Sequence, residues 1–199
     1  MTQLLTILLA YCLGCSNMAL YLSKLNKVDL RAGGSRNLGA ANATILLGWK
    51  AGVLTAVHDA GKALLSVLLA RLLCPGSELM AAAAGIACVL GHIFPAPMKF
   101  RGGKGFAPYV GMTLALHWKF ALVVLAVVAL VTLLTDYIVA GTTATVLMVP
   151  SYLGWARQDL WLAGVLLIGT VVIICKHREN YARIWAGTEF RTRAAFKRK

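Results

Sequence analysis

The sequence predicts an all-α polytopic membrane protein with about seven transmembrane helices. Of its 199 residues, 59% are hydrophobic and only 14% are charged, and the mean hydropathy is +0.74. A soluble domain of this size needs more charge to cover its surface. The apolar residues also form continuous runs instead of amphipathic stripes, and several runs approach the roughly 20 residues that span about 30 Å of hydrocarbon.

The runs place the elements in order along a single predicted domain, residues 1–199. The first run lacks the basic segment of a signal peptide, so we interpret it as a retained helix. Pro95 and Pro97 end the third run, because proline breaks a helix. The fourth run is short, which indicates a tilted or partly re-entrant segment. The predicted spans are residues 2–22, 50–73, 79–95, 106–118, 119–135, 137–156 and 159–175.

The formal net charge of +13 is concentrated in three stretches, residues 24–50, 99–104 and 176–199. The positive-inside rule favours a cytoplasmic location for all three. The N-terminus is then outside, the C-terminus is cytoplasmic, and the number of crossings is odd. The basic tail, about 190–199, is expected to lie near anionic lipid heads. A membrane protein with this charge distribution does not require nucleic acid as a partner.

Three polar segments fall on one side of the membrane in this topology: residues 33–42, 91–105 and 177–189. Each combines glycines or amides with at least one cation. Glycine lets a phosphate approach main-chain N–H groups, and a following helix N-terminus adds its dipole. Lysine and arginine neutralise the phosphate charge. The pattern favours a phosphate-bearing ligand held at the membrane surface.

Each segment taken alone also fits an ordinary cytoplasmic turn, in which His92 and His177 simply cap helices. The run Gly102-Gly103-Lys104-Gly105 is not a Walker loop, because no serine or threonine follows the lysine. The placement of all three segments on one face favours a common functional role.

Asp59 and Lys62 lie three residues apart inside the second span. A lone charge there costs about 2.5–3.5 kcal/mol on insertion scales, so such groups usually pair or line a polar cavity. Two interpretations stay open. The pair either holds helices together, or Lys62 makes a pocket electropositive.

The three segments resemble, in order and spacing, those of the PlsY family, the bacterial membrane glycerol-3-phosphate acyltransferases that use acyl phosphate. The family pattern reads approximately G-S-G-N-x-G-A-T-N, then G-H-x-F-P…F-K-G-G-K-G-x-A-T, then H-R-E-N-x-x-R-L-x-x-G-T-E. The resemblance extends from about residue 28 to residue 189. The third motif departs only at Ile184, which replaces leucine.

The resemblance implies transfer of a fatty acyl group from acyl phosphate to the sn-1 hydroxyl of glycerol 3-phosphate. The products are lysophosphatidic acid and phosphate, in phospholipid biosynthesis. It also implies an external N-terminus and a site that faces the cytoplasm from the bacterial inner membrane. No cofactor, coenzyme A, acyl carrier protein or metal is expected, and we expect a monomer.

The resemblance assigns site residues by position. The implied catalytic residues are Ser35, Lys104, His177 and Asn180. The implied substrate-binding residues are Gly34, Arg36, Asn37, Gly39, Asn42, His92, Gly102, Gly103, Thr142, Glu179 and Arg183. Because acyl phosphate is already activated, we expect direct attack without an acyl-enzyme. A substrate phosphate oxygen or His177 accepts the proton.

The sequence also departs from the family outside the third motif. Arg36 replaces glycine and Ile45 replaces an arginine that is expected to bind the acceptor phosphate. Our hypothesis is that Arg36 supplies the missing cation. The other departures are Ala41 and Pro108 for threonine and Ala63 for glycine.

Three alternatives remain: a paralogue with another acceptor, a non-catalytic relative that binds lipid or anions, and a small transporter with an anion path past Asp59 and Lys62. A transporter predicts polar residues along several spans and at both faces. Their concentration at one face favours an enzyme.

Overall fold

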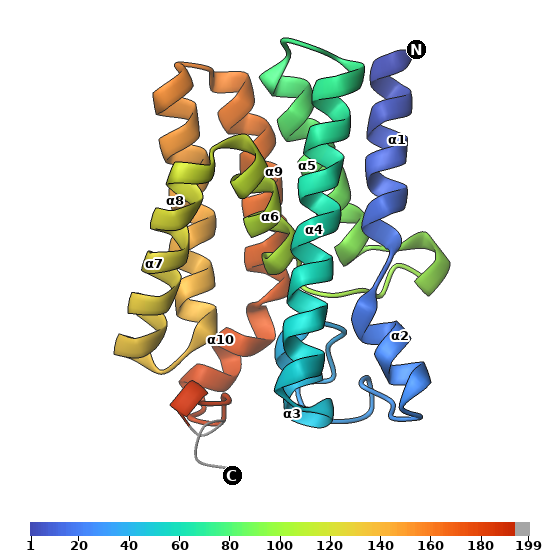
Figure 1. Cartoon of the computed structure of the whole chain (residues 1–199). Helices are drawn as coiled ribbons and strands as arrows, with labels where there is room; N and C mark the ends of the chain where they lie inside the picture. The colour runs from blue at the N-terminus through green and yellow to red at the C-terminus, as the bar shows by residue number, and fades with distance from the viewer. Residues whose placement is uncertain (194–199) are drawn as a thin grey trace. The chain divides into compact units, whose positions relative to one another are not determined.

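The computed structural model describes residues 1–193, and every regular element in that range is helical (Figure 1). The predicted tail lies partly outside this range, at residues 194–199. The first elements are α1 (Thr2–Cys15), α2 (Met18–Leu25), α3 (Ala40–Leu47), α4 (Trp49–Leu73), α5 (Glu78–Ile93), the 3₁₀ turn η1 (Ala96–Met98) and α6 (Phe106–Leu116). They are followed by α7 (Trp118–Thr135), α8 (Ile138–Arg157), α9 (Leu160–Lys176) and α10 (Arg178–Trp185).

Five of the described segments are long and apolar enough to cross a bilayer: Thr2–Leu25, Trp49–Leu73, Glu78–Met98, Trp118–Thr135 and Ile138–Arg157. The pair α9 and α10, bent by 45°, makes a sixth candidate. Helix α6 has 11 residues, a length of about 16 Å at 1.5 Å per residue, which is too short to cross alone. The seven crossings and the orientation of the termini therefore stay predictions.

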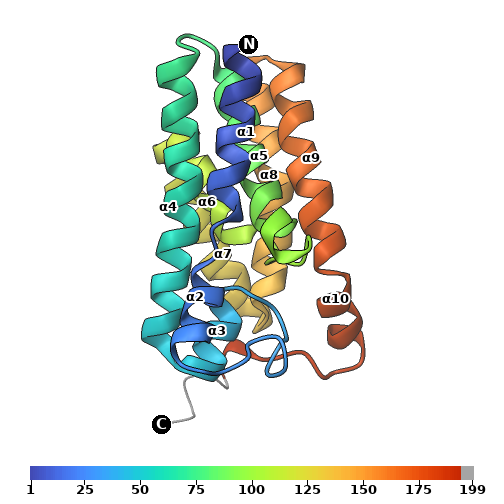
Figure 2. The ribbon, with the colours of Figure 1, turned by 90° about the vertical axis from the view of Figure 1, so that its right-hand side faces the viewer.

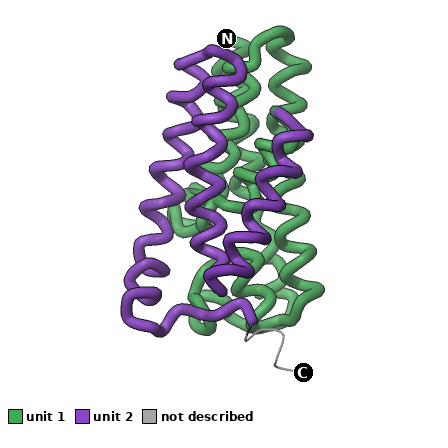
Figure 3. Tube along the Cα trace, turned by 90° about the vertical axis from the view of Figure 1, so that its left-hand side faces the viewer, with its two compact units in different colours: residues 1–116 green, residues 117–199 purple. Residues whose placement is uncertain are grey.

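The contacts divide the chain into two compact units, Met1–Leu116 and His117–Lys199 (Figure 3). The single domain over residues 1–199 stays a prediction. In the first unit, α1 packs on α4 and α5, and α4 packs on α6 (Figure 2). Small residues permit these close approaches. A Cβ added at Gly14 would collide with the Cys88 backbone, and one at Gly91 with the Tyr11 carbonyl.

The first predicted span, residues 2–22, is not one continuous helix. Helix α1 ends at Cys15, and Asn17 begins α2 as its N-cap, accepting a hydrogen bond from the Leu20 N–H at 2.8 Å. The Asn17 amide also donates to the Leu38 carbonyl at 3.2 Å. The break thus attaches the first span to the first polar segment.

The connection between the first two predicted spans is partly helical. Helix α2 continues to Leu25, and α3 begins at Ala40 with Gly39 as its N-cap. The end of the first motif is therefore the first turn of a helix, which directs backbone N–H groups toward the preceding loop.

The second unit contains α7, α8 and α9, with α8 packed against both neighbours. Pro150 lies inside α8 and cannot donate to the Val146 carbonyl, four residues earlier. The Thr170 hydroxyl of α9 donates to that carbonyl at 2.6 Å. A side chain of the next helix thus satisfies the backbone group that the proline frees, as an apolar environment requires.

Candidate functional site

The first polar segment is organised by Asn42, which is fully buried in the first turn of α3. Its side-chain oxygen accepts a hydrogen bond from the Ser35 N–H at 2.8 Å. Its amide nitrogen donates to the Leu30 carbonyl at 2.7 Å and to the Gly33 carbonyl at 3.3 Å. These contacts give Asn42 a clear role in shaping the loop, while its predicted contact with substrate stays a prediction.

Two neighbouring loop positions have left-handed backbone, with φ of +57° at Gly34 and +55° at Arg36. A side chain at Gly34 would collide with the Asn42 oxygen, so glycine is required there. At Arg36 an L-residue is strained by about 1–2 kcal/mol in this conformation. The Arg36 side chain is exposed, whereas Ser35, Asn37 and Gly39 are half-buried.

The second segment folds back on the end of α5. The Gly102 N–H donates to the Ile93 carbonyl and the Gly103 N–H to the His92 carbonyl, both at 3.1 Å. A Cβ at Gly102 would collide with that His92 carbonyl and lie 2.6 Å from the Pro95 ring. Both glycines are therefore required because the loop passes too close to its neighbours for any side chain.

Gly103 also joins the first two segments. A Cβ at this residue would collide with Nε2 of His92 and lie 2.9 Å from the Leu38 carbonyl of the first segment. The Arg31 guanidinium donates to the Arg101 carbonyl at 2.7 Å and makes a second link. The structure therefore brings the first and second predicted segments together within the first unit.

The contact lies beside the start of α6, which Lys104 and Gly105 precede. Gly105 has a φ of +91°, so it turns the chain into the helix, and Lys104 is half-buried. The unpaired N–H groups and the dipole of a helix N-terminus attract anions. A lysine, tightly packed glycines and a helix start together make a site suited to phosphate.

Asp59 and Lys62 form an ion pair with 3.1 Å between the carboxylate Oδ1 and the ammonium Nζ. The ammonium also contacts Nδ1 of His92 at 2.9 Å. The pair therefore links α4 to His92 in the last turn of α5, which belongs to the second segment. Neither residue is among the predicted site residues, although their position inside an apolar span is the signal that identifies them.

The third segment follows α9 in the second unit. His177 is buried at the end of α9, and its Nδ1 lies 2.8 Å from the Ile173 carbonyl. Because a carbonyl only accepts, Nδ1 carries the hydrogen, and Nε2 of the neutral ring is an acceptor. This geometry suits a residue that takes up a proton.

Glu189 organises the rest of this segment, and it is absent from the predicted site residues. One carboxylate oxygen accepts from the Asn180 amide and the other from Nε of Arg183, both at 2.6 Å. Glu179 is exposed and lies 4.0 Å from Arg183. Glu189 closes the loop that follows α10, and the motif G-T-E is the signal that could have identified it.

Thr142 is buried in α8, and its hydroxyl donates to the Ile138 carbonyl at 3.1 Å. The adjacent Thr143 contacts the third segment instead, with its hydroxyl 2.8 Å from that of Tyr181. The proposed substrate contact of Thr142 therefore stays a prediction.

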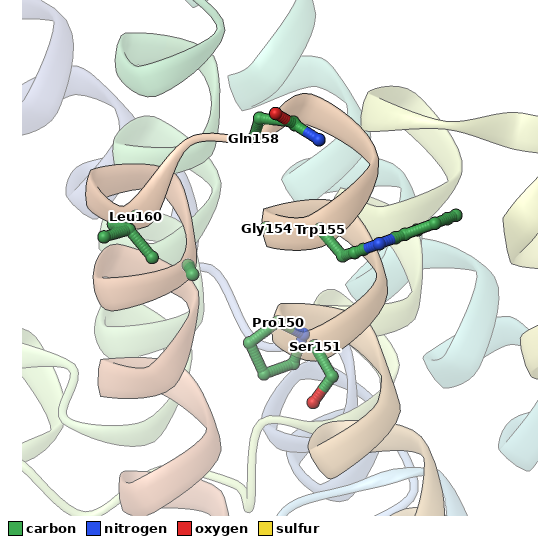
Figure 4. A pocket seen from close by; sticks show the side chains of 7 residues that line it. Pro150, Ser151, Gly154, Trp155, Gln158 and Leu160 are labelled. Atoms are coloured by element: carbon green, nitrogen blue, oxygen red, sulfur yellow. The ribbon is translucent and has the colours of Figure 1, made fainter.

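The second unit also contains an open cleft of about 470 Å³ at the turn between α8 and α9 (Figure 4). His177 lies at the opposite end of α9, about 25 Å away along 17 residues. None of the predicted site residues lines this cleft. Its lining residues are Pro150, Ser151, Gly154, Trp155, Gln158, Leu160 and Ala163. Within residues 1–193, no three His, Cys, Asp or Glu side chains are grouped in a way that could hold a metal ion.

Comparison with known proteins decides the family. The sequence model of the glycerol-3-phosphate acyltransferases matches residues 4–187. The chain belongs to this family. It is 42% identical over 189 residues to a glycerol-3-phosphate acyltransferase of Pseudomonas putida, with 92% of this chain and 95% of the relative covered. It is 32% identical over 204 residues to glycerol-3-phosphate acyltransferase 1 of Oceanobacillus iheyensis, with 96% of each covered.

Solved structures of PlsY, an integral membrane glycerol 3-phosphate acyltransferase, are also similar. Its glycerol 3-phosphate form aligns with a TM-score of 0.91 at 31% identity, covering 96% of each chain. Its lysophosphatidic acid form aligns with a TM-score of 0.89 at 30% identity, covering 98% of this chain and 99% of that one. The predicted membership of the PlsY family is confirmed. The protein is an acyltransferase of phospholipid biosynthesis and a multi-pass membrane protein.

Proposed function

We propose that this acyltransferase moves a fatty acyl group from acyl phosphate to the sn-1 hydroxyl of glycerol 3-phosphate. The products are lysophosphatidic acid and inorganic phosphate. One observation carries the proposal. The first and second polar segments, residues 33–42 and 91–105, are the two glycine-rich segments, and they lie against each other at Gly103, beside Lys104 and the start of α6. Two phosphate-bearing substrates require such a surface, because close anions repel unless cations and N–H groups surround them.

The proposed chemistry needs no protein nucleophile. The sn-1 oxygen attacks the acyl carbonyl, the bond from that carbon to the phosphate oxygen breaks, and phosphate leaves with the bonding pair. The hydroxyl proton passes to Nε2 of His177 or to a substrate phosphate oxygen. The hydrogen bond from Nδ1 of His177 to the Ile173 carbonyl supports the first route, because it leaves Nε2 as the acceptor. Ser35 and Asn180 are proposed to hold the substrates.

Arg36 is proposed to replace the cation that the family has at Ile45. Ile45 packs under the first segment, and its Cγ2 would lie 3.4 Å from a Cβ at Gly34. Arg36 is two residues further along the same loop, with its side chain exposed. A guanidinium in this position can reach an acceptor phosphate from the loop side instead of the helix side.

We further propose seven crossings, an external N-terminus, a cytoplasmic C-terminus and a location in the bacterial inner membrane, with the site facing the cytoplasm. The three basic stretches of the sequence support this orientation. Glycerol 3-phosphate and acyl phosphate are the proposed substrates, membrane lipids the surroundings, and a monomer the working unit.

The test is phosphate release from palmitoyl phosphate by the purified protein in detergent, with glycerol 3-phosphate as acceptor. We expect acceptor-dependent release and its loss in Lys104→Ala. Release with another phosphorylated alcohol only would identify a paralogue with a different acceptor. Binding of acyl phosphate without release would identify a non-catalytic relative. A covalent acyl adduct on Ser35 would contradict direct attack.

A further inference from the structure

A buried polar cluster lies in the first unit where the first span breaks. Its central members are Asp59, Lys62 and His92, which are 1%, 5% and 3% exposed. Oδ1 of Asp59 lies 3.1 Å from Nζ of Lys62 and 3.5 Å from Nδ1 of His92. The negative charge of the Asp59 carboxylate is balanced by the positive charge of the Lys62 ammonium.

His58 completes the cluster on its outer side. Its Nδ1 lies 3.3 Å from Oδ1 of Asp59, and its Nε2 lies 3.0 Å from the Ser16 hydroxyl. The carboxylate of Asp59 therefore contacts Lys62 and two imidazole rings. These polar partners offset the free-energy cost of burying its charge.

The ammonium of Lys62 determines which nitrogen of His92 carries the hydrogen. An ammonium has three donors and accepts nothing. Lys62 donates to the Gly14 carbonyl at 2.9 Å and to the Ser16 carbonyl at 2.6 Å. Its third hydrogen is shared between Nδ1 of His92 at 2.9 Å and Oδ1 of Asp59 at 3.1 Å, and an N–H on Nδ1 would face this ammonium. Nδ1 therefore accepts, and the hydrogen of the neutral ring is on Nε2.

His92 transmits this arrangement to the second segment in two ways. Its Nε2 is the nearest atom to a Cβ built at Gly103, so the ring lies against that glycine. Its carbonyl accepts the Gly103 N–H at 3.1 Å. A rotation or shift of His92 would displace Gly103 directly.

The first segment depends on the same ammonium. The Gly14 and Ser16 carbonyls lie at the C-terminal end of α1, and the Asn17 amide between α1 and α2 donates to the Leu38 carbonyl. Lys62 thus holds the carbonyls of the break on one side and His92 on the other. The positions of both glycine-rich segments therefore depend on contacts made by one buried ion pair.

We propose that Asp59 and Lys62 are positioning residues for phosphate binding. They hold His92 as the Nε2–H tautomer against Gly103 and thereby fix the two loops that meet there. The inference rests on the proposed function, because it takes these loops as the phosphate-binding surface. Misplacing them weakens the binding of the acceptor equally in the ground and transition states, which raises KM more than it lowers kcat.

The first measurement is histidine-selective ¹⁵N NMR of the wild-type protein, which has four histidines. The His92 signals are assigned as those that disappear in His92→Gln. We expect them to show that His92 carries its hydrogen on Nε2. Lys62→Met should remove this single-tautomer signature. A hydrogen on Nδ1 of His92 in the wild type would overturn the proposal. This readout is independent of catalysis.

The second measurement is the KM for glycerol 3-phosphate, with Arg71→Met as the matched control. Arg71 lies on the same helix as Lys62, pairs with Glu78 at 2.9 Å and donates to the Ala115 carbonyl at 2.7 Å. These partners lie outside both glycine-rich segments. Lys62→Met should raise KM about tenfold or more, since small misplacements lower rates by large factors. Arg71→Met should lower the thermal midpoint and leave KM within about twofold.

Two further variants separate position from folding. Asp59→Asn/Lys62→Met removes both charges, so it should recover thermal stability over Lys62→Met while KM stays high. His92→Gln places an amide nitrogen near the Nε2 position and should retain more activity than His92→Asn, which mimics Nδ1. Equal KM values in the double variant and the wild type would overturn the proposal, as would better activity in His92→Asn.

The proposed function can fail separately. If the wild type shows no acyl transfer, the thermal shift produced by inorganic phosphate replaces KM as the readout. The positioning role then predicts a shift in the wild type and in Arg71→Met, and a much weaker one in Asp59→Asn/Lys62→Met. Equal shifts in the wild type and the double variant would reject it.

Discussion

Replacing Arg36 with glycine should affect stability and substrate binding in opposite directions. Arg36 adopts left-handed backbone with a φ of +55°, a conformation that glycine tolerates without strain. Relief of this strain is worth about 1–2 kcal/mol. The greater conformational freedom of glycine in the unfolded chain offsets about 0.4–1 kcal/mol of this gain in stability. We therefore expect Arg36→Gly to raise the free energy of unfolding by roughly 0.5–1 kcal/mol.

The same change removes the cation that we assign to the acceptor phosphate. A hydrogen bond to a charged group contributes about 1.5–3 kcal/mol, and the exposure of Arg36 favours the lower end. Since about 1.4 kcal/mol is a factor of ten, the KM for glycerol 3-phosphate should rise about tenfold.

Two companion variants distinguish charge from backbone. Arg36→Gln loses the charge and keeps the strain, so it should raise KM without gaining stability. Arg36→Lys keeps both, so its KM should stay within about threefold of the wild type. The assays are steady-state phosphate release and thermal unfolding in detergent. A normal KM in Arg36→Gly would refute the assignment of Arg36 as the replacement cation.

Three further changes test the loops themselves. Gly103→Ala should abolish acyl transfer, because the added methyl group collides with the His92 ring; wild-type kinetics in this variant would show that the contact is wrong. Asn42→Ala leaves the Ser35 N–H without its acceptor and should lower the free energy of unfolding by about 1–3 kcal/mol, measured by thermal or denaturant unfolding. An unchanged midpoint would contradict its role in shaping the loop. Glu189→Gln keeps an acceptor for Asn180 but weakens the ion pair with Arg183, so it should reduce kcat/KM less than Glu189→Ala; equal losses would contradict this.

Much of the fold follows from hydropathy alone. The predicted second to seventh apolar runs agree within about two residues with α4 to α9, since apolar runs of this length cross a bilayer as α-helices. The break at Asn17 was not predicted. Its cause is a buried amide that caps α2 and bonds to Leu38, a contact 21 residues away that no local pattern encodes.

The site was predicted by motif, and its internal bonding was not. The glycines at 102 and 103 were assigned to phosphate, and the structure adds that His92 packs too close for any side chain. Asn42 and Glu189 act on neighbouring loop residues through buried hydrogen bonds. Such roles depend on which atoms face each other after folding, and residue type alone does not specify that.

The central claim is the proposed orientation, in which all three polar segments face the cytoplasm. The most direct test labels single cysteines at the exposed alanines Ala32, Ala96 and Ala186 with an impermeant maleimide, in a background without the five native cysteines. Vesicles of both orientations should give labelling of all three only when the cytoplasmic face is outward. Labelling of any one of them from the opposite face would contradict this orientation.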